Sequence, residues 1–465
     1  MTAENGKEQG KKGIFDFSLV PVIFSLAWPT MLEQFMQTAV QYIDTAMVGS
    51  LGTEATAAVG STSTVSWLVG SAVSAFGIGF LAIISQSLGA GDERRAQRAS
   101  GQAVFMMLVT GLVLTVLILS LSGFIPRWMQ VDEKILDLAS TYFFIIYLPM
   151  LFRTSTIICG TVLRAAGDTR TPMWVSLAVN GINVVLNYFL IFDTRKVDLL
   201  GLKVWIPGAG LGVIGAAAAS AAAFTFGGTA MFLALMKNPG ISPKGERILP
   251  DPEILGPCMR VAIPNMLQRF CTSLGYVVFA SMINSLGDVS TAAHTIANTV
   301  ESTFYIPGYG MQTAAATLTG NAIGARNEKG RKAMSRMIVL IEAAMMILSA
   351  AVLFLFAPAF VSLFTKSETV MTLTVTVLRM VALSEPFYGI SIVVEGMLQG
   401  AGETRQPFVF NTLSMWGVRI GGTALCTLVL GLGLVSAWAC MIGNNMLLCL
   451  LFVVYYVFFY KAEIK

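Results

Sequence analysis

Long apolar runs, separated by short polar turns, follow one another along the whole chain. A run of about 20 predominantly apolar residues is long enough to cross a bilayer as a helix. Twelve such runs can be delimited: Ser18–Gly49, Thr53–Ser87, Arg98–Gly123, Leu136–Thr161, Thr171–Phe192, Gly210–Met236, Ile254–Ser285, Ser290–Ile323, Lys332–Ala357, Thr369–Met397, Gln406–Leu432 and Gly433–Tyr460. The pattern predicts an all-α polytopic membrane protein with 12 transmembrane helices.

The second six runs repeat the first six. Three pairs of segments recur 235 residues apart: Pro29–Gly52 with Pro264–Gly287, Ser87–Arg95 with Ala322–Gly330, and Ala165–Pro172 with Gly400–Pro407. Farther on, Leu211–Ala216 recurs as Leu432–Ala437 at an offset of 221, so the first half carries 14 extra residues, around Asp193–Trp205. An even number of spans gives both halves the same orientation, as in transporters with parallel repeats. We therefore expect two pseudo-symmetric six-helix lobes.

The positions of the charged residues predict the domain boundaries of the chain and its orientation in the membrane. The Pro-, Gly- and charge-rich stretch between the halves is the plausible linker, which predicts a cytoplasmic tail (1–17), an N-lobe (18–236), a cytoplasmic linker (237–253), a C-lobe (254–460) and a second cytoplasmic tail (461–465). With this orientation the inner loops and tails hold 20 Lys and Arg residues, and the outer loops hold 6. The excess predicts a multi-pass protein of the plasma membrane (the inner membrane of a prokaryote) with both termini cytoplasmic.

Composition narrows the class of protein. Of the residues, 55% are hydrophobic and 12% charged, whereas about a quarter are charged in soluble domains. All six cysteines lie inside apolar runs without a CxxC pair, so we expect core residues, not disulfides or zinc ligands. The single histidine, His294, argues against a metal centre or a His-dependent enzyme, and we expect a protein that is not an enzyme. A GxxxxGK[ST] phosphate loop is missing, so energy must come from an ion gradient.

The first span carries a polar stripe. Gln34, Gln37, Gln41 and Asp44 fall on one helical face. Hydrocarbon offers them no hydrogen bonds, so this face must meet protein or water. The three glutamines could line a substrate path, together with Met31 and Tyr147. The 25 methionines and 29 phenylalanines suit a surface that accepts varied ligands, although most of them must face lipid or the core.

Three polar residues in the fifth and sixth spans reach the same depth as Asp44. They are Asn183, Asn187 and Ser220. A carboxylate, two amide oxygens and a hydroxyl suit Na⁺, and a buried carboxylate can equally exchange a proton. In the second half their counterparts are Phe279, Val418, Gly422 and Met441. The asymmetry suggests that the four act together in the first lobe, although polar residues that hold helices together could show it too.

Four further charges fall near mid-span in the second-half helices. Arg269, Glu301, Glu385 and Arg419 lie at one depth, and a lone charge there would cost several kcal/mol. We expect them to pair, Glu301 with Arg419 first. One interpretation is that the cluster locks the helices of the lobe. The other is that Glu385, or Glu33 in the first span, attracts cationic drugs.

Several short motifs, in order, resemble those of the multidrug and toxic compound extrusion (MATE) family. They are QYIDTAMVGSLG, SLGAGD, LRAAGDTRTP, AAHTIANTVESTFYIPGYG, LQGAGETRQP and MWGVR. The resemblance implies two six-helix lobes and cation-driven export of bulky, often cationic or amphipathic organic compounds. Asp44 matches the family's helix-one aspartate and Asn183 its helix-five asparagine.

The remaining site positions vary within the family. Asn187 stands where some members carry a second aspartate, and Ser220 replaces a threonine. One carboxylate is enough for one H⁺ or one Na⁺, and H⁺ is slightly favoured because fewer charges make a poorer Na⁺ cage. NorM-like members place further carboxylates where this chain has Thr272 and Tyr388, which argues against a second-lobe site of that type.

These observations predict a secondary-active exporter that works by alternating access, with the cation exchanged at Asp44. No cofactor is expected besides the coupling ion. The expected partners are small amphipathic or cationic drugs and the lipid bilayer, with no nucleic acid, and we expect a monomer. The alternative is a lipid-linked precursor flippase of the same superfamily. It would need several arginines for a pyrophosphate, and Glu301 and Glu385 balance those in the second half.

Overall fold

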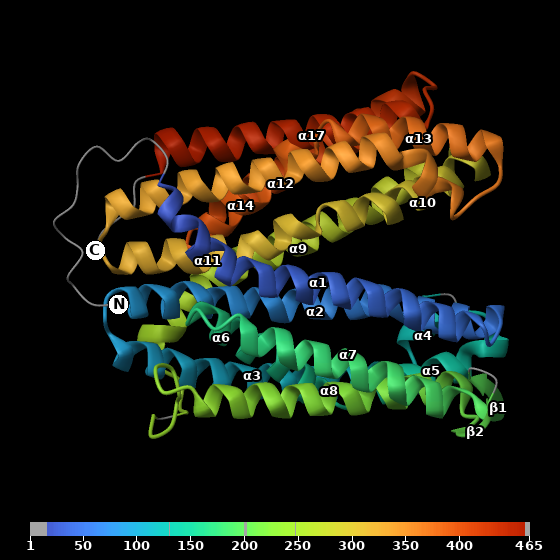
Figure 1. Cartoon of the computed structure of the whole chain (residues 1–465), viewed down its shortest axis with the longest axis horizontal. Coiled ribbons are helices and arrows are strands. Elements are labelled where there is room, and N and C mark those ends of the chain that lie inside the picture. The colour runs from blue at the N-terminus through green and yellow to red at the C-terminus, as the bar shows by residue number, and fades with distance from the viewer. Residues whose placement is uncertain (1–15, 130, 200–201, 247, 461–465) are drawn as a thin grey trace. The chain divides into compact units, whose positions relative to one another are not determined.

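The computed structural model describes residues 16–129, 131–199, 202–246 and 248–460, and nearly all of its elements are helices (Figure 1). The α-helices are α1 (Val20–Gly49), α2 (Thr53–Gly89), α3 (Glu93–Leu121), α4 (Ile125–Trp128), α5 (Glu133–Tyr147), α6 (Met150–Ala165), α7 (Arg170–Ile191), α8 (Gly212–Lys237), α9 (Pro252–Asn284), α10 (Asp288–Phe304), α11 (Ile306–Gly324), α12 (Glu328–Ser362), α13 (Glu368–Ala382), α14 (Glu385–Gly400), α15 (Arg405–Leu413), α16 (Gly422–Ala424) and α17 (Leu434–Val454). A 3₁₀ turn, η1 (Phe17–Leu19), precedes α1, and three π-helical segments are η2 (Ser414–Gly421), η3 (Leu425–Val429) and η4 (Tyr455–Phe459).

The twelve predicted spans all correspond to helical segments. Within the described residues, eight helices are long and apolar enough to cross a membrane alone, and the bent pairs α5–α6 and α13–α14 raise the number to ten. The other two spans are interrupted: one is α10 with α11, and the other is the run from α15 to η3. The chain is an all-α polytopic membrane protein.

Prolines stand at three of the breaks in the spans. Pro149 stands between α5 and α6, which meet at a bend of 47°, and Pro386 is near the start of α14, which meets α13 at 52°. Pro307 stands in the first turn of α11. A proline ring has no N–H to donate and clashes with the preceding turn, which favours a bend or a break, although α1, α9 and α12 continue past their prolines. The first half has Ala72 where the second has Pro307, and α2 continues without a break.

The repeat predicted from sequence is present in the helix boundaries. Helices start at offsets of 235 five times: Thr53 and Asp288, Glu93 and Glu328, Glu133 and Glu368, Met150 and Glu385, and Arg170 and Arg405. The turns before them repeat as well. Asp92 accepts a hydrogen bond from the Arg95 amide at 2.9 Å, and Asn327, 235 residues later, accepts one from the Gly330 amide at 2.8 Å. Such side chains satisfy amides that a helix start leaves unpaired.

The 14 extra residues of the first half form a hairpin, which the sequence did not predict. Strand β1 (Asp193–Leu199) pairs antiparallel with β2 (Leu202–Ala209), with Leu199 opposite Leu202 and a register irregularity between Asp193 and Arg195. The hairpin follows α7 directly and leads into α8. It therefore lengthens the connection between two neighbouring helices without disturbing their packing.

By its internal contacts the chain forms two compact units. Unit 2 comprises Pro29–Ile84 and Asp92–Leu274, and unit 1 comprises the described residues up to Trp28, Ser85–Gly91 and the chain from Gly275 onward. Three long helices, α1, α2 and α9, thus divide their residues between the units. The lobe boundaries at 236 and 254, expected from sequence, stay a prediction.

Small residues bring the helices of unit 2 close together. A Cβ placed on Gly228 of α8 would collide with the Phe152 carbonyl and lie 2.6 Å from the Phe152 Cα in α6. At the same contact, the Ser155 hydroxyl donates to the Gly228 carbonyl at 2.9 Å. Lipid gives apolar side chains no drive to associate, so close backbone packing and hydrogen bonds between helices carry the stability here.

Gly228→Ala should lower the free energy of unfolding by about 1–3 kcal/mol, because the added methyl overpacks the α6–α8 contact. Gly181→Ala in α7 is the matched control, since nothing lies within 4 Å of its added Cβ and alanine is about 1 kcal/mol better than glycine in a helix. Thermal unfolding of the detergent-purified proteins measures the change in stability for each of the two variants. Equal midpoint temperatures for the two variants would contradict the prediction.

Candidate functional site

Asp44 lies in the penultimate turn of α1, where its side chain is half-buried in unit 2. The Asn187 amide donates a hydrogen bond to Asp44 Oδ1 at 2.7 Å. Asn187 is 2% exposed and stands about one turn before the end of α7. The structure thus brings the carboxylate of α1 and an amide of α7 together.

Asn183 and Ser220 complete the group. Asn183 is one turn before Asn187 on the same face of α7. Its amide stands 2.9 and 3.0 Å from the two oxygens of Asp44 and 3.0 Å from the Ser220 hydroxyl of α8. Donors and acceptors match when its Nδ2 faces Asp44 and its Oδ1 accepts from Ser220. All four predicted residues therefore belong to one hydrogen-bonded network.

Helices α7 and α8 hold this network because their backbones nearly touch. A Cβ on Gly215 of α8 would be 2.6 Å from the Leu190 carbonyl carbon and 3.0 Å from the Ile191 nitrogen. The alanine-rich start of α8 leaves no bulky side chain between the helices. Ser220 can therefore reach Asn183 with its short side chain.

The donor set of the network suits a single monovalent cation. Two amide groups donate to Asp44, which compensates its charge when no cation is bound. Asn187 Oδ1 is buried and has no partner. If the amides turn their oxygens inward, a cation would meet carboxylate, amide and hydroxyl oxygens, which are the hard ligands Na⁺ takes. A proton could instead bind directly to the carboxylate.

Some of the residues proposed for a substrate path are exposed, and others are buried. Gln34, Gln37 and Gln41 are exposed on the surface of unit 2, and Met31 is half-buried. Tyr147 is fully buried, its hydroxyl donates to the Ser66 hydroxyl at 2.9 Å, and the Arg153 guanidinium lies 5.8 Å from its ring centre. Tyr147 therefore packs inside unit 2, and the glutamines are the part of this set that a ligand can reach.

Glu33 forms a buried ion pair that the sequence did not reveal. Arg164 Nη2 of α6 lies 2.7 Å from both Glu33 oxygens, and the Ser176 hydroxyl of α7 donates to Oε1 at 2.7 Å. The side chains are 6% (Glu33) and 17% (Arg164) exposed. The pair fixes α1 to α6 and α7 shortly after Pro29. Arg164, the first arginine of the LRAAGDTR motif, was the available signal for a partner.

The predicted charge cluster divides between the units. Glu301, Glu385 and Arg419 lie in unit 1, whereas Arg269 belongs to unit 2, where its Nε donates to Asn265 Oδ1 at 3.0 Å. Among the described residues, no ion pair within 4.0 Å joins Glu301 to Arg419, and Arg419 Nε is buried without a hydrogen-bond partner. Both oxygens of Glu385 are also buried without a hydrogen-bond partner. The expected Glu301–Arg419 pair is therefore not formed as a direct contact.

Aromatic rings surround this cluster. The Arg419 guanidinium lies 4.8 Å from the ring centre of Tyr276 and 4.3 Å from that of Phe279. Tyr305 packs edge-on against Tyr309 and Tyr388 at 5.7 and 5.6 Å, and the hydroxyls of the latter two are 3.2 Å apart. Phe279, the counterpart of Asp44, thus contacts a guanidinium that is part of the protein.

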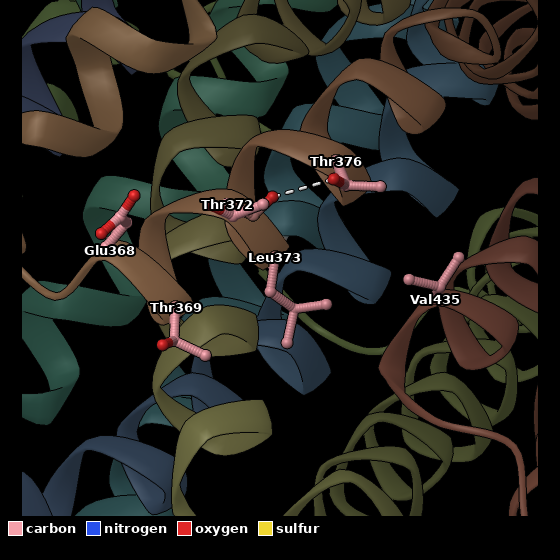
Figure 2. Close-up of a pocket in the computed structure, with 6 residues that line it drawn as sticks. All are labelled: Glu368, Thr369, Thr372, Leu373, Thr376 and Val435. Carbon is pink, nitrogen blue, oxygen red and sulfur yellow. Dashed lines mark hydrogen bonds between the residues drawn. The ribbon is translucent and has the colours of Figure 1, made fainter.

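A separate surface pocket in unit 1 contains none of these residues. It has a volume of about 480 Å³ and is lined by Glu368, Thr369, Thr372, Leu373, Thr376 and Val435 (Figure 2). Its polar groups are threonines, of which Thr376 already donates to the Thr372 carbonyl, and the exposed Glu368. The polar network around Asp44 is therefore the better candidate for a cation site.

The chain matches the family model described as MatE over residues 29–189 and 264–425. It is 26% identical over 422 residues to "Probable multidrug resistance protein NorM" of Thermotoga maritima, covering 91% of this chain and 89% of that protein. It is 27% identical over 414 residues to "Probable multidrug resistance protein YpnP" of Bacillus subtilis, covering 88% of each.

Solved structures share the fold. "Outward-facing conformation of a multidrug resistance MATE family transporter of the MOP superfamily" superposes with a TM-score of 0.85 at 23% identity, over 93% of this chain and 94% of that one. "Crystal structure of MATE in the bent conformation" gives a TM-score of 0.85 at 22% identity, with the same coverage.

Glu33→Gln should lower the free energy of unfolding by about 3–5 kcal/mol, because it leaves the Arg164 charge buried without a carboxylate. The double variant Glu33→Gln/Arg164→Gln should cost less than the two single variants added together, since it removes both charges. Thermal or denaturant unfolding in detergent measures the three variants. Strictly additive effects would show that the pair does not stabilise the α1–α6 contact as a unit.

Proposed function

Because the chain belongs to the MATE family of membrane transporters, we propose that it is a secondary-active multidrug exporter that exchanges organic compounds, cationic ones among them, for H⁺ or Na⁺. The names of its relatives support multidrug export. We place the protein in the plasma membrane as a monomer with both termini in the cytoplasm, in keeping with the distribution of Lys and Arg.

The observation that carries the proposal is the hydrogen bonding of Asp44 to Asn183 and Asn187. In the cation-free state both amides donate to the carboxylate. A proton on Asp44 removes the acceptor charge, and Na⁺ requires the amides to turn their oxygens inward. Either event changes the bonds that join α1 to α7. The cation can therefore bind one conformation of unit 2 more tightly than the other, which coupling requires.

The site favours H⁺ slightly over Na⁺. Asp44 is its one carboxylate, and its near neighbours are neutral amides and a hydroxyl. A single negative charge provides a weak cage for Na⁺ but is sufficient for a proton. We therefore propose an exchange of one cation at this site in each cycle.

The tyrosine cluster of unit 1 is our candidate for the attraction of organic cations. Tyr276 and Tyr309 are 40% and 37% exposed, and the uncompensated Glu385 lies on α14 beside Tyr388. Aromatic faces and a carboxylate together favour ammonium and guanidinium groups. This arrangement also argues against a lipid-linked precursor flippase, because Arg164 is paired with Glu33 and the Arg419 guanidinium packs against the rings of Tyr276 and Phe279, which leaves neither available for a pyrophosphate.

The decisive experiment is transport by proteoliposomes. Proteoliposomes are prepared with wild type, with Asp44→Asn and with the control Glu54→Gln, and they are loaded with fluorescent organic cations such as ethidium. Glu54 is the control position because its carboxylate is exposed in the first turn of α2. H⁺ and Na⁺ gradients are imposed separately. We expect one gradient to drive transport by wild type and the control, and Asp44→Asn to lose at least about tenfold in gradient-driven rate, since a neutral amide cannot exchange a cation.

Unchanged gradient-driven transport by Asp44→Asn would overturn the role of the carboxylate. A wild-type protein that moves neither cationic nor neutral dyes under either gradient would overturn multidrug export itself. Dependence on one gradient alone identifies the coupling ion.

A further inference from the structure

Glu342 lies in the middle of α12, in a position that the predicted site residues do not include. Its side chain is fully buried, and neither carboxyl oxygen has a hydrogen-bond partner. The apolar run IVLIEAAMMI around it provides no polar neighbour along the helix. An ionised carboxylate without a partner costs several kcal/mol or more in such surroundings.

Two glycines make room for this carboxyl group. A Cβ on Gly389 of α14 would be 2.7 Å from Glu342 Oε1, and a Cβ on Gly308 of α11 would be 3.0 Å from it. Apolar side chains lie beside the glycines, since a Cβ on Gly308 would also be 3.2 Å from Ile392 Cδ1 of α14. The carboxyl therefore sits in a notch between α11, α12 and α14 that lacks a hydrogen-bond donor.

Among the described residues, no side chain forms an ion pair or a hydrogen bond with Glu342. The titratable or charged groups on the helices that pack against α12 are Asp288, His294 and Glu301 on α10, Tyr309 on α11, Glu368 and Arg379 on α13, and Glu385, Tyr388 and Glu395 on α14, with Tyr305 between α10 and α11. The positive charge in this set is that of Arg379, whose Nε donates to the Phe354 carbonyl at 3.3 Å, about three turns farther along α12 than Glu342.

From this notch we propose that Glu342 is a proton-binding site of unit 1, separate from Asp44, which holds its proton at neutral pH and releases it when the pH is raised. The ligand is a proton because the glycines on α11 and α14 lie close to the carboxyl oxygen and neither carboxyl oxygen has a hydrogen-bond partner. The proposal does not depend on the transport function.

Dicyclohexylcarbodiimide is a direct probe, because it reacts with protonated carboxyl groups in apolar surroundings. The acid adds across a C=N bond, and the adduct rearranges to a stable N-acylurea that mass spectrometry can locate. We expect labelling of Glu342 in the intact protein at pH 7 to exceed that of Glu395 by at least about tenfold. Glu395 is the control because it accepts hydrogen bonds from Gln399 at 3.0 Å and Asn411 at 3.3 Å. Labelling should fall as the pH is raised.

The second measurement compares thermal unfolding of wild type and Glu342→Gln between pH 5 and 10. Glutamine imitates the neutral acid in shape, so the two proteins should be equally stable at low pH. Wild type should lose stability relative to the variant as the pH rises, because deprotonation places a charge in the notch. Glu342 labelling no faster than that of Glu395, or unfolding curves that stay parallel across this range, would overturn the proposal. The labelling result stands even if the variant does not fold.

Discussion

A charge inside an apolar helix bundle needs a partner, and this constraint accounts for the buried polar contacts that α1 makes. The Glu33 carboxylate pairs with the Arg164 guanidinium and accepts a hydrogen bond from the Ser176 hydroxyl. The Asp44 carboxylate accepts hydrogen bonds from the amides of Asn183 and Asn187. The partners of the two acids therefore differ in charge, and we propose cation exchange only for Asp44, whose partners are neutral.

The two halves of the internal repeat share the arrangement of their helices but differ in the polar residues that these helices carry. Matching helices begin at matching positions in the two halves, and α5–α6 and α13–α14 bend by nearly equal angles. The halves differ where a single residue changes the backbone or the charge. Pro307 breaks the second half's counterpart of α2, and the hairpin lengthens only the first half. Function can therefore differ between the halves while the scaffold stays the same.

The spans and the residues around Asp44 could be predicted from sequence because both depend on position along a helix. Apolar length locates a span, and counting residues from its end gives depth, which placed Asn183, Asn187 and Ser220 near the carboxylate. Depth does not reveal which neighbouring helix a side chain faces. The Glu33–Arg164 pair could not be predicted because it depends on the direction in which Glu33 points. Arg269 was grouped with Glu301, Glu385 and Arg419 by depth alone, although these three residues belong to the other unit. Glu342 was missed because its notch is created by glycines on two other helices.

The contact between Arg419 and Phe279 has a consequence for how the two halves respond to their surroundings. Phe279 stands where the first half has Asp44, and a guanidinium 4.3 Å from its ring centre supplies the positive charge there. That charge is covalently attached and cannot dissociate. If Asp44 exchanges a cation as we propose, the positive charge at this position in the first half depends on the concentration of that ion, whereas the positive charge beside Phe279 is present at every concentration.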